Sequence, residues 1–182
     1  MYVQGGHYAQ WAAFLDRWGA GEPVDPATLP ALEPADFHAD SWDRLSGRIF
    51  DALAKRMKAW SQTLTRELGT ADEFGAARAL NHARWSLVPI RALAGAPALP
   101  EEVRAKLTDL VDTQIRGGQR QLDESVERMR RSGAPRAAVE ARLRTIRDNP
   151  LTAVTEHTNR HVSGDAWAAD PLATPRRRVI VD

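Results

Sequence analysis

One long run of helical periodicity constrains the fold more than any other feature of this chain. Between residues 42 and 68, large apolar side chains recur three, four or seven residues apart, which places them along one side of an α-helix. They are Trp42, Leu45, Ile49, Leu53, Trp60, Leu64 and Leu68. A helix of about seven turns with one apolar side needs other helices to cover that side in water. The stripe therefore predicts a helical bundle.

Weaker stripes predict the other helices of this bundle. A second helix is expected to begin near residue 71, where Thr70 and Glu73 have the spacing of a capping box, and Pro89 should kink or end it. Its apolar side would carry Phe74 and Trp85 among others. The expected fold class is all-α, with about four main helices, short N- and C-terminal helices, and an extended C-terminal tail.

The third and fourth main helices lie further along the chain. The third is expected to start at Pro100 and to continue past Gly117 and Gly118, which indicate a close approach by another helix rather than a hinge. The fourth follows near residues 139–146, and a last short helix is expected over residues 150–162.

Composition divides the chain into three segments. Residues 1–40 are expected to form a short amphipathic helix and an acidic, Pro-rich segment that wraps over the bundle or acts as a linker. Residues 41–162 are expected to form the bundle core, and residues 163–182 an extended basic tail. Residues 1–43 hold one arginine and seven acidic residues, while residues 44–100 hold nine basic and four acidic residues. This asymmetry favours an acidic segment lying across a basic surface of its own chain.

Several function classes are disfavoured by what the sequence lacks. It contains no cysteine, which excludes disulfides, thiolate zinc sites and cysteine nucleophiles. It has no phosphate-binding glycine loop and no nucleophile elbow, so nucleotide enzymes and serine hydrolases are not expected. No stretch resembles a signal peptide or a membrane span. We therefore expect a cytoplasmic protein that associates with no membrane and binds no cofactor. The sequence disfavours an enzyme.

Two histidines in "HTNRH", His157 and His161, are four residues apart and could share one metal ion on one side of a helix. Thr158 stands where a zinc protease would carry its glutamate, so that chemistry lacks its general base. With His82 on the second helix, the set resembles the metal-binding bundle superfamily of DinB-type proteins. The resemblance implies a divalent metal bound by these three histidines. The alternative is a polar helix end with His161 at the core edge.

A DNA-binding alternative rests on residues 136–161, which can be interpreted as two helices joined by a tight turn. Thr155, Asn159 and Arg160 would then be the side chains able to contact base edges. The formal net charge of +1 is low for a nucleic-acid binder. Nucleic acid is therefore a candidate partner that the sequence does not favour.

The two ends of the chain carry the expected protein-binding residues. Trp11 and Trp18 lie on a helix too short to be stable alone, so it must dock on its own bundle or on another subunit. The tail carries a basic, strand-like run suited to binding a partner, although it could also be a frayed end. This run is Arg176, Arg177, Arg178, Val179 and Ile180. The sequence thus predicts a non-enzymatic interaction, assembly or regulatory protein that self-associates or joins a larger complex.

Overall fold

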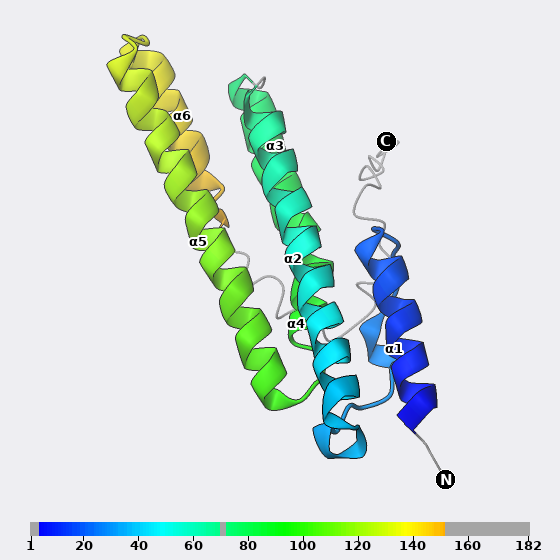
Figure 1. The fold of residues 1–182 in the computed structure, drawn as a ribbon. Coiled ribbons are helices and arrows are strands. Elements are labelled where there is room, and N and C mark those ends of the chain that lie inside the picture. Colours follow the sequence, from blue (N-terminus) through cyan, green and yellow to red (C-terminus); the bar gives the residue numbers. More distant parts are fainter. Residues whose placement is uncertain (1–3, 70–71, 152–182) are drawn as a thin grey trace, which may run out of the picture.

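The structure, a computed structural model, describes residues 4–69 and 72–151 and is all-α (Figure 1). This confirms the predicted fold class, since no strand occurs in those two ranges. The expected helix over residues 150–162 and the C-terminal tail lie outside the described residues, except for Pro150 and Leu151.

The described chain consists of α-helices of very different lengths, with two short 3-10 turns in the Pro-rich segment. The 3-10 turns are η1 (Pro26–Thr28) and η2 (Pro34–Asp36). The α-helices are α1 (Gln4–Gly19), α2 (Ala39–Gly69), α3 (Glu73–Ser86), α4 (Val88–Ala94), α5 (Glu101–Arg131) and α6 (Arg136–Asp148).

Two long helices, α2 and α5, form the frame of the molecule. Each has 31 residues and is therefore about 45 Å long. In one half of the bundle, α2 packs on α3, α3 on α6, α6 on α5 and α5 on α2, so the four helices enclose a common core (Figure 1). Because α6 has only 13 residues, it covers part of α5. In the other half α4 packs against both α5 and α2.

The break between α3 and α4 lets the chain change neighbours, and Pro89 causes it as predicted. Pro89 lies in the first turn of α4, where a backbone N–H would have no partner within the helix, so proline costs no hydrogen bond there. The N–H of Leu87 bonds to the carbonyl of Arg84 at 3.1 Å. The carbonyl of Ala83 instead accepts a buried hydrogen bond of 2.9 Å from the indole Nε1 of Trp60. Trp60 thereby satisfies a carbonyl at the helix end and ties α3 to α2.

The start of α3 corrects one prediction. Asp72, not Thr70, is the N-cap residue, and its Oδ1 accepts the N–H of Gly75 at 2.7 Å. Both threonine and aspartate can cap a helix, so the residue types alone did not determine at which residue α3 begins.

Helix α1 docks on α2 of its own chain. Trp11 and Trp18 are both 0% exposed, and the indole Nε1 of Trp11 donates to the carbonyl of Pro30 at 2.8 Å. Arg48 of α2 forms an ion pair of 2.7 Å with Asp16, and this hydrogen bond raises the pKa of Arg48. The Pro-rich segment then crosses to the α4–α5 connection, where the N–H of Leu32 donates to the carbonyl of Ala98 at 2.7 Å.

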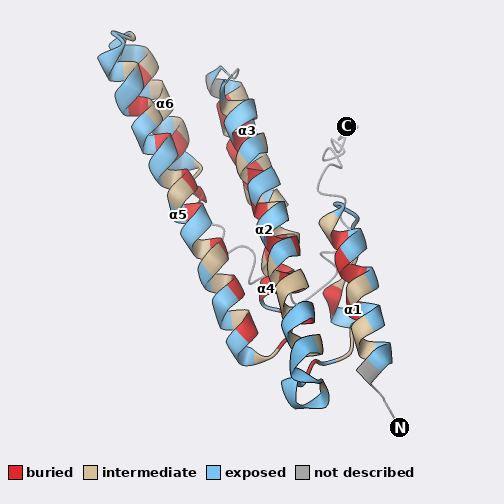
Figure 2. Cartoon of the chain, viewed as in Figure 1, coloured by how far each residue is buried: buried red, intermediate tan, exposed pale blue. Residues whose placement is uncertain are grey.

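Buried residues follow the helix faces that point at neighbouring helices (Figure 2). Gly118 confirms the predicted close approach: a Cβ there would lie 3.3 Å from Cη2 of Trp60 and 3.4 Å from Cδ1 of Leu151, whereas one at Gly117 would meet nothing within 4 Å. Phe74 and Trp85 differ from the expectation, because they are 79% and 42% exposed. Both lie on the outer side of α3.

Candidate binding groove between α2 and α3

A groove lies between α2 and α3 and begins where α1 ends. Its apolar walls are formed by Trp60 and Leu64 of α2 and by Ile90 of α4. The remaining lining residues are Arg56, Ala59, Thr63, Glu67, His82, Ala83 and Ser86. Its volume is about 200 Å³, below the 300–1,000 Å³ or so of pockets that enclose a cofactor or a drug-sized ligand. The space suits one bulky side chain.

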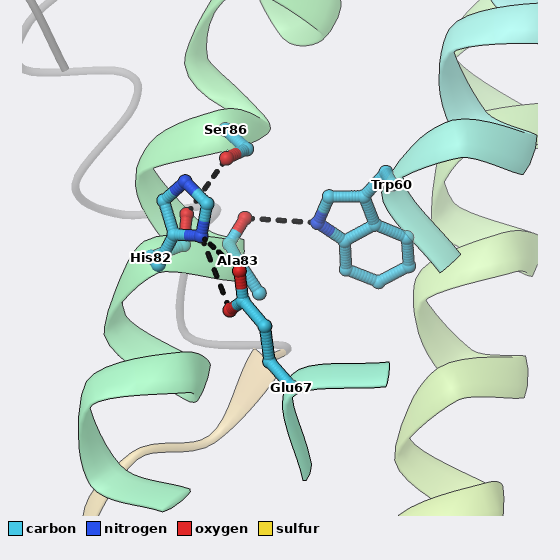
Figure 3. A network of polar contacts seen from close by, with 5 residues as sticks. All are labelled: Trp60, Glu67, His82, Ala83 and Ser86. Atoms are coloured by element: carbon cyan, nitrogen blue, oxygen red, sulfur yellow. Dashed lines mark hydrogen bonds and ion pairs between the residues drawn. The ribbon is translucent and has the colours of Figure 1, made fainter. Parts of the chain in front are cut away.

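A carboxylate–imidazole pair closes one end of the groove. His82 Nδ1 lies 3.2 Å from both carboxylate oxygens of Glu67, and the two side chains are each one-third exposed (Figure 3). The contact joins α2 to α3 across the groove. Because Glu67 engages Nδ1, the neutral tautomer with hydrogen on Nδ1 leaves Nε2 as an acceptor.

The Ser86 hydroxyl, which also lines the groove, bonds to the backbone of its own helix. Ser86 Oγ donates to the backbone carbonyl of His82 at 2.9 Å (Figure 3). It therefore makes the bond to the preceding turn that helical serines often form, and it does not donate to the imidazole. A nucleophile and a base in hydrogen-bond contact, which covalent catalysis requires, are not formed by these two residues.

Arg56 occupies the other end of the groove. Its Nε donates to the carbonyl of Trp18 at 2.8 Å, and its guanidinium carbon lies 4.5 Å from the centre of the Trp18 ring. Burial lowers the pKa of Arg56, since the charged form loses solvation. The groove thus carries a cation at one end and a carboxylate at the other, about 16 Å apart along α2.

The predicted metal ligands are only partly placed by the structure. His82 lies in the groove with Glu67, while His157 and His161 lie outside the described residues. In the described ranges, no three His, Cys, Asp or Glu side chains are arranged to hold a metal ion.

Most of the other predicted site residues lie outside the described residues as well. They are Thr155, Asn159, Arg160, Arg176, Arg177, Arg178, Val179 and Ile180. Trp11 and Trp18 are described and are buried against their own chain. Their role in partner binding stays a prediction, and it would require α1 to leave α2.

The sequence did not identify Glu67 and Arg56 as groove residues, and it did not predict that Phe74 is exposed. Glu67 and His82 are separated by the turn between α2 and α3, and only the packing of those helices brings them together. The exposure of Phe74 could have been predicted, because it follows Asp72 and precedes Gly75 near a helix start, where few neighbours can cover a side chain.

Comparison with known proteins supplied no relative: no protein family, curated protein or solved structure matches the chain. Within the described part of the chain, no helix has both the length and the apolar character needed to cross a lipid bilayer.

Proposed function

We propose that this chain is a non-enzymatic helical interaction protein that holds a bulky apolar side chain of a partner protein in the groove between α2 and α3. The observation that carries the proposal is the groove itself, an apolar slot of about 200 Å³ with opposite charges at its two ends. Interfaces are commonly anchored by one large side chain in such a pocket, with polar groups at the rim.

The polar groups of the groove fit recognition better than catalysis. Glu67 and His82 are paired with each other across two helices, and the Ser86 hydroxyl is bound to helix backbone. Arg56 is held by the carbonyl of Trp18. Each group is thereby fixed in place, as expected of groups that orient a bound segment.

The test is to fill the groove without touching the core. Ala59 is an exposed lining residue, so Ala59→Trp should occupy the groove while leaving the fold intact. A photoreactive amino acid at Thr63, also in the lining, should form a cross-link to a protein partner in the native cell. We expect Ala59→Trp to reduce that cross-link about tenfold or more.

Gln62→Trp is the matched control, because Gln62 is exposed on the same helix but does not line the groove. Equal cross-linking in both tryptophan variants would contradict the proposal. So would one equivalent of a divalent metal in the purified protein that is lost in His82→Ala, since it would favour the metal-binding alternative, in which Glu67 orients the imidazole for a ligand role.

A further inference from the structure

The charged ends of the α2–α3 groove define the kind of segment that fits it. Arg56 at one end is held by the carbonyls of Trp18 and Glu22, and such contacts leave its positive charge without a neutralising carboxylate. Glu67 at the other end is one-third exposed. A complementary segment therefore carries a basic group for the Glu67 end, an apolar side chain for the slot between, and an acidic group for the Arg56 end.

One run of the sequence has this order of side chains. Residues 176–182 read "RRRVIVD". Side chains of an extended chain alternate between two sides, so Arg178, Ile180 and Asp182 share one side. The backbone positions of Arg178 and Asp182 are then about 13 Å apart, against about 16 Å between the two charged ends of the groove. The long arginine side chain spans the remaining distance.

This run is attached close to the groove. Residues 152–182 lie outside the described residues, and the last described residue, Leu151, is buried. Leu151 and the groove-lining Trp60 both lie against Gly118 of α5. Residues 152–175 would span about 80 Å when fully extended, which exceeds the length of about 45 Å of the whole of α2. The connection is therefore long enough for the run to reach the groove of its own chain.

We infer that residues 176–182 bind in the α2–α3 groove of their own chain, with Ile180 in the apolar slot, Arg178 at Glu67 and Asp182 at Arg56. The same chain is favoured over a second copy, because covalent attachment raises the local concentration of the run at the groove. This inference rests on the proposed function, since it names the segment that competes with the partner for the same groove. The run thereby regulates partner binding.

The test uses the full chain with a photoreactive amino acid at Thr63, which lines the groove. Irradiation of the purified protein should give an intrachain cross-link to residues 176–182, identified by mass spectrometry. Ile180→Asp should lower its yield about tenfold or more, because a charged side chain cannot replace an apolar one in the slot. Leu172→Asp is the matched control, because Leu172 is apolar but precedes the run, and its yield should stay within about twofold.

An equal mixture of isotope-labelled and unlabelled chains distinguishes the same chain from a second copy. A cross-link within one chain joins two peptides of the same isotopic composition. A cross-link between copies also joins labelled to unlabelled peptides. We expect only the first kind of product.

The orientation of the run is tested by exchanging charges. Arg178→Glu and Glu67→Arg should each lower the intrachain yield about fivefold, and the double variant should recover most of it. Arg177→Glu is the control, because alternation places Arg177 on the opposite side of the extended run. Far-ultraviolet circular dichroism of each variant ensures that a lower yield is not a loss of fold.

Three results would overturn the inference: no intrachain product at residues 176–182, a product that joins labelled to unlabelled chains, or equal effects of Arg177→Glu and Arg178→Glu. In the native cell, Ile180→Asp should raise the cross-link from Thr63 to the partner about threefold or more, because the groove is freed. A partner cross-link without the intrachain product would keep the proposed function and remove its regulation. The intrachain product without a partner cross-link would do the reverse.

Discussion

Two adjacent glycines in the middle of α5 have opposite environments, and they offer a test of packing at the residue scale. Alanine is favoured over glycine in a helix by about 1 kcal/mol, so Gly117→Ala, which meets open space, should raise the free energy of unfolding by that amount. At Gly118 the new Cβ meets the Trp60 ring at 3.3 Å. That ring is held by its bond to Ala83 and cannot easily retreat.

Gly118→Ala should therefore be destabilising, because overpacking of about 1–3 kcal/mol exceeds the gain in helix propensity. Urea unfolding of the two single variants measures both effects against the same helix. A Gly118→Ala protein as stable as Gly117→Ala would mean that α5 is not held close to Trp60 in solution.

At the scale of elements, the buried face of α1 predicts that this helix stabilises the whole chain. Trp11 and Trp18 are fully buried, and truncation of a buried tryptophan to alanine costs about 3–5 kcal/mol. Trp11→Ala and Trp18→Ala should each lower the melting temperature strongly, and removal of residues 1–21 should do the same. Gln10→Ala, at an exposed position of α1, is the control and should leave the melting temperature unchanged.

An unchanged melting temperature in the truncated chain would show that α1 is not docked in solution. It would then be free to act on another protein, as the sequence also allowed.

The elements also show what the sequence could and could not predict. The stripe from Trp42 to Leu68 predicted α2 because it spans many turns, and Pro89 predicted the end of α3 because proline cannot continue a helical bond. The sequence could not show which surface covers Trp11 and Trp18, since periodicity identifies an apolar face but not its neighbour. For the same reason His82 was recognised as a candidate ligand, while its contact with Glu67 depends on how α2 and α3 pack.

At the scale of the whole molecule, one continuous core extends from Trp11 in α1 to Leu151 after α6. Helices from both halves of the bundle share it, and α2 and α5 run through both halves. A chain with a single core should unfold cooperatively. We therefore expect one transition in urea, with tryptophan fluorescence and far-ultraviolet circular dichroism changing together.

The measurement is best made at two protein concentrations, because self-association would make the unfolding midpoint depend on protein concentration. Three of the tryptophans, Trp11 and Trp18 in α1 and Trp60 in α2, are buried, and the Trp60 indole bonds to Ala83 of α3. Fluorescence therefore reports on the packing of α1, α2 and α3, while circular dichroism reports on all helices. If fluorescence changed at lower urea than circular dichroism, α1 would be detaching before the bundle unfolds. The shared core would then be two weakly coupled parts, with Arg56, which bonds to the carbonyl of Trp18, at the boundary between them.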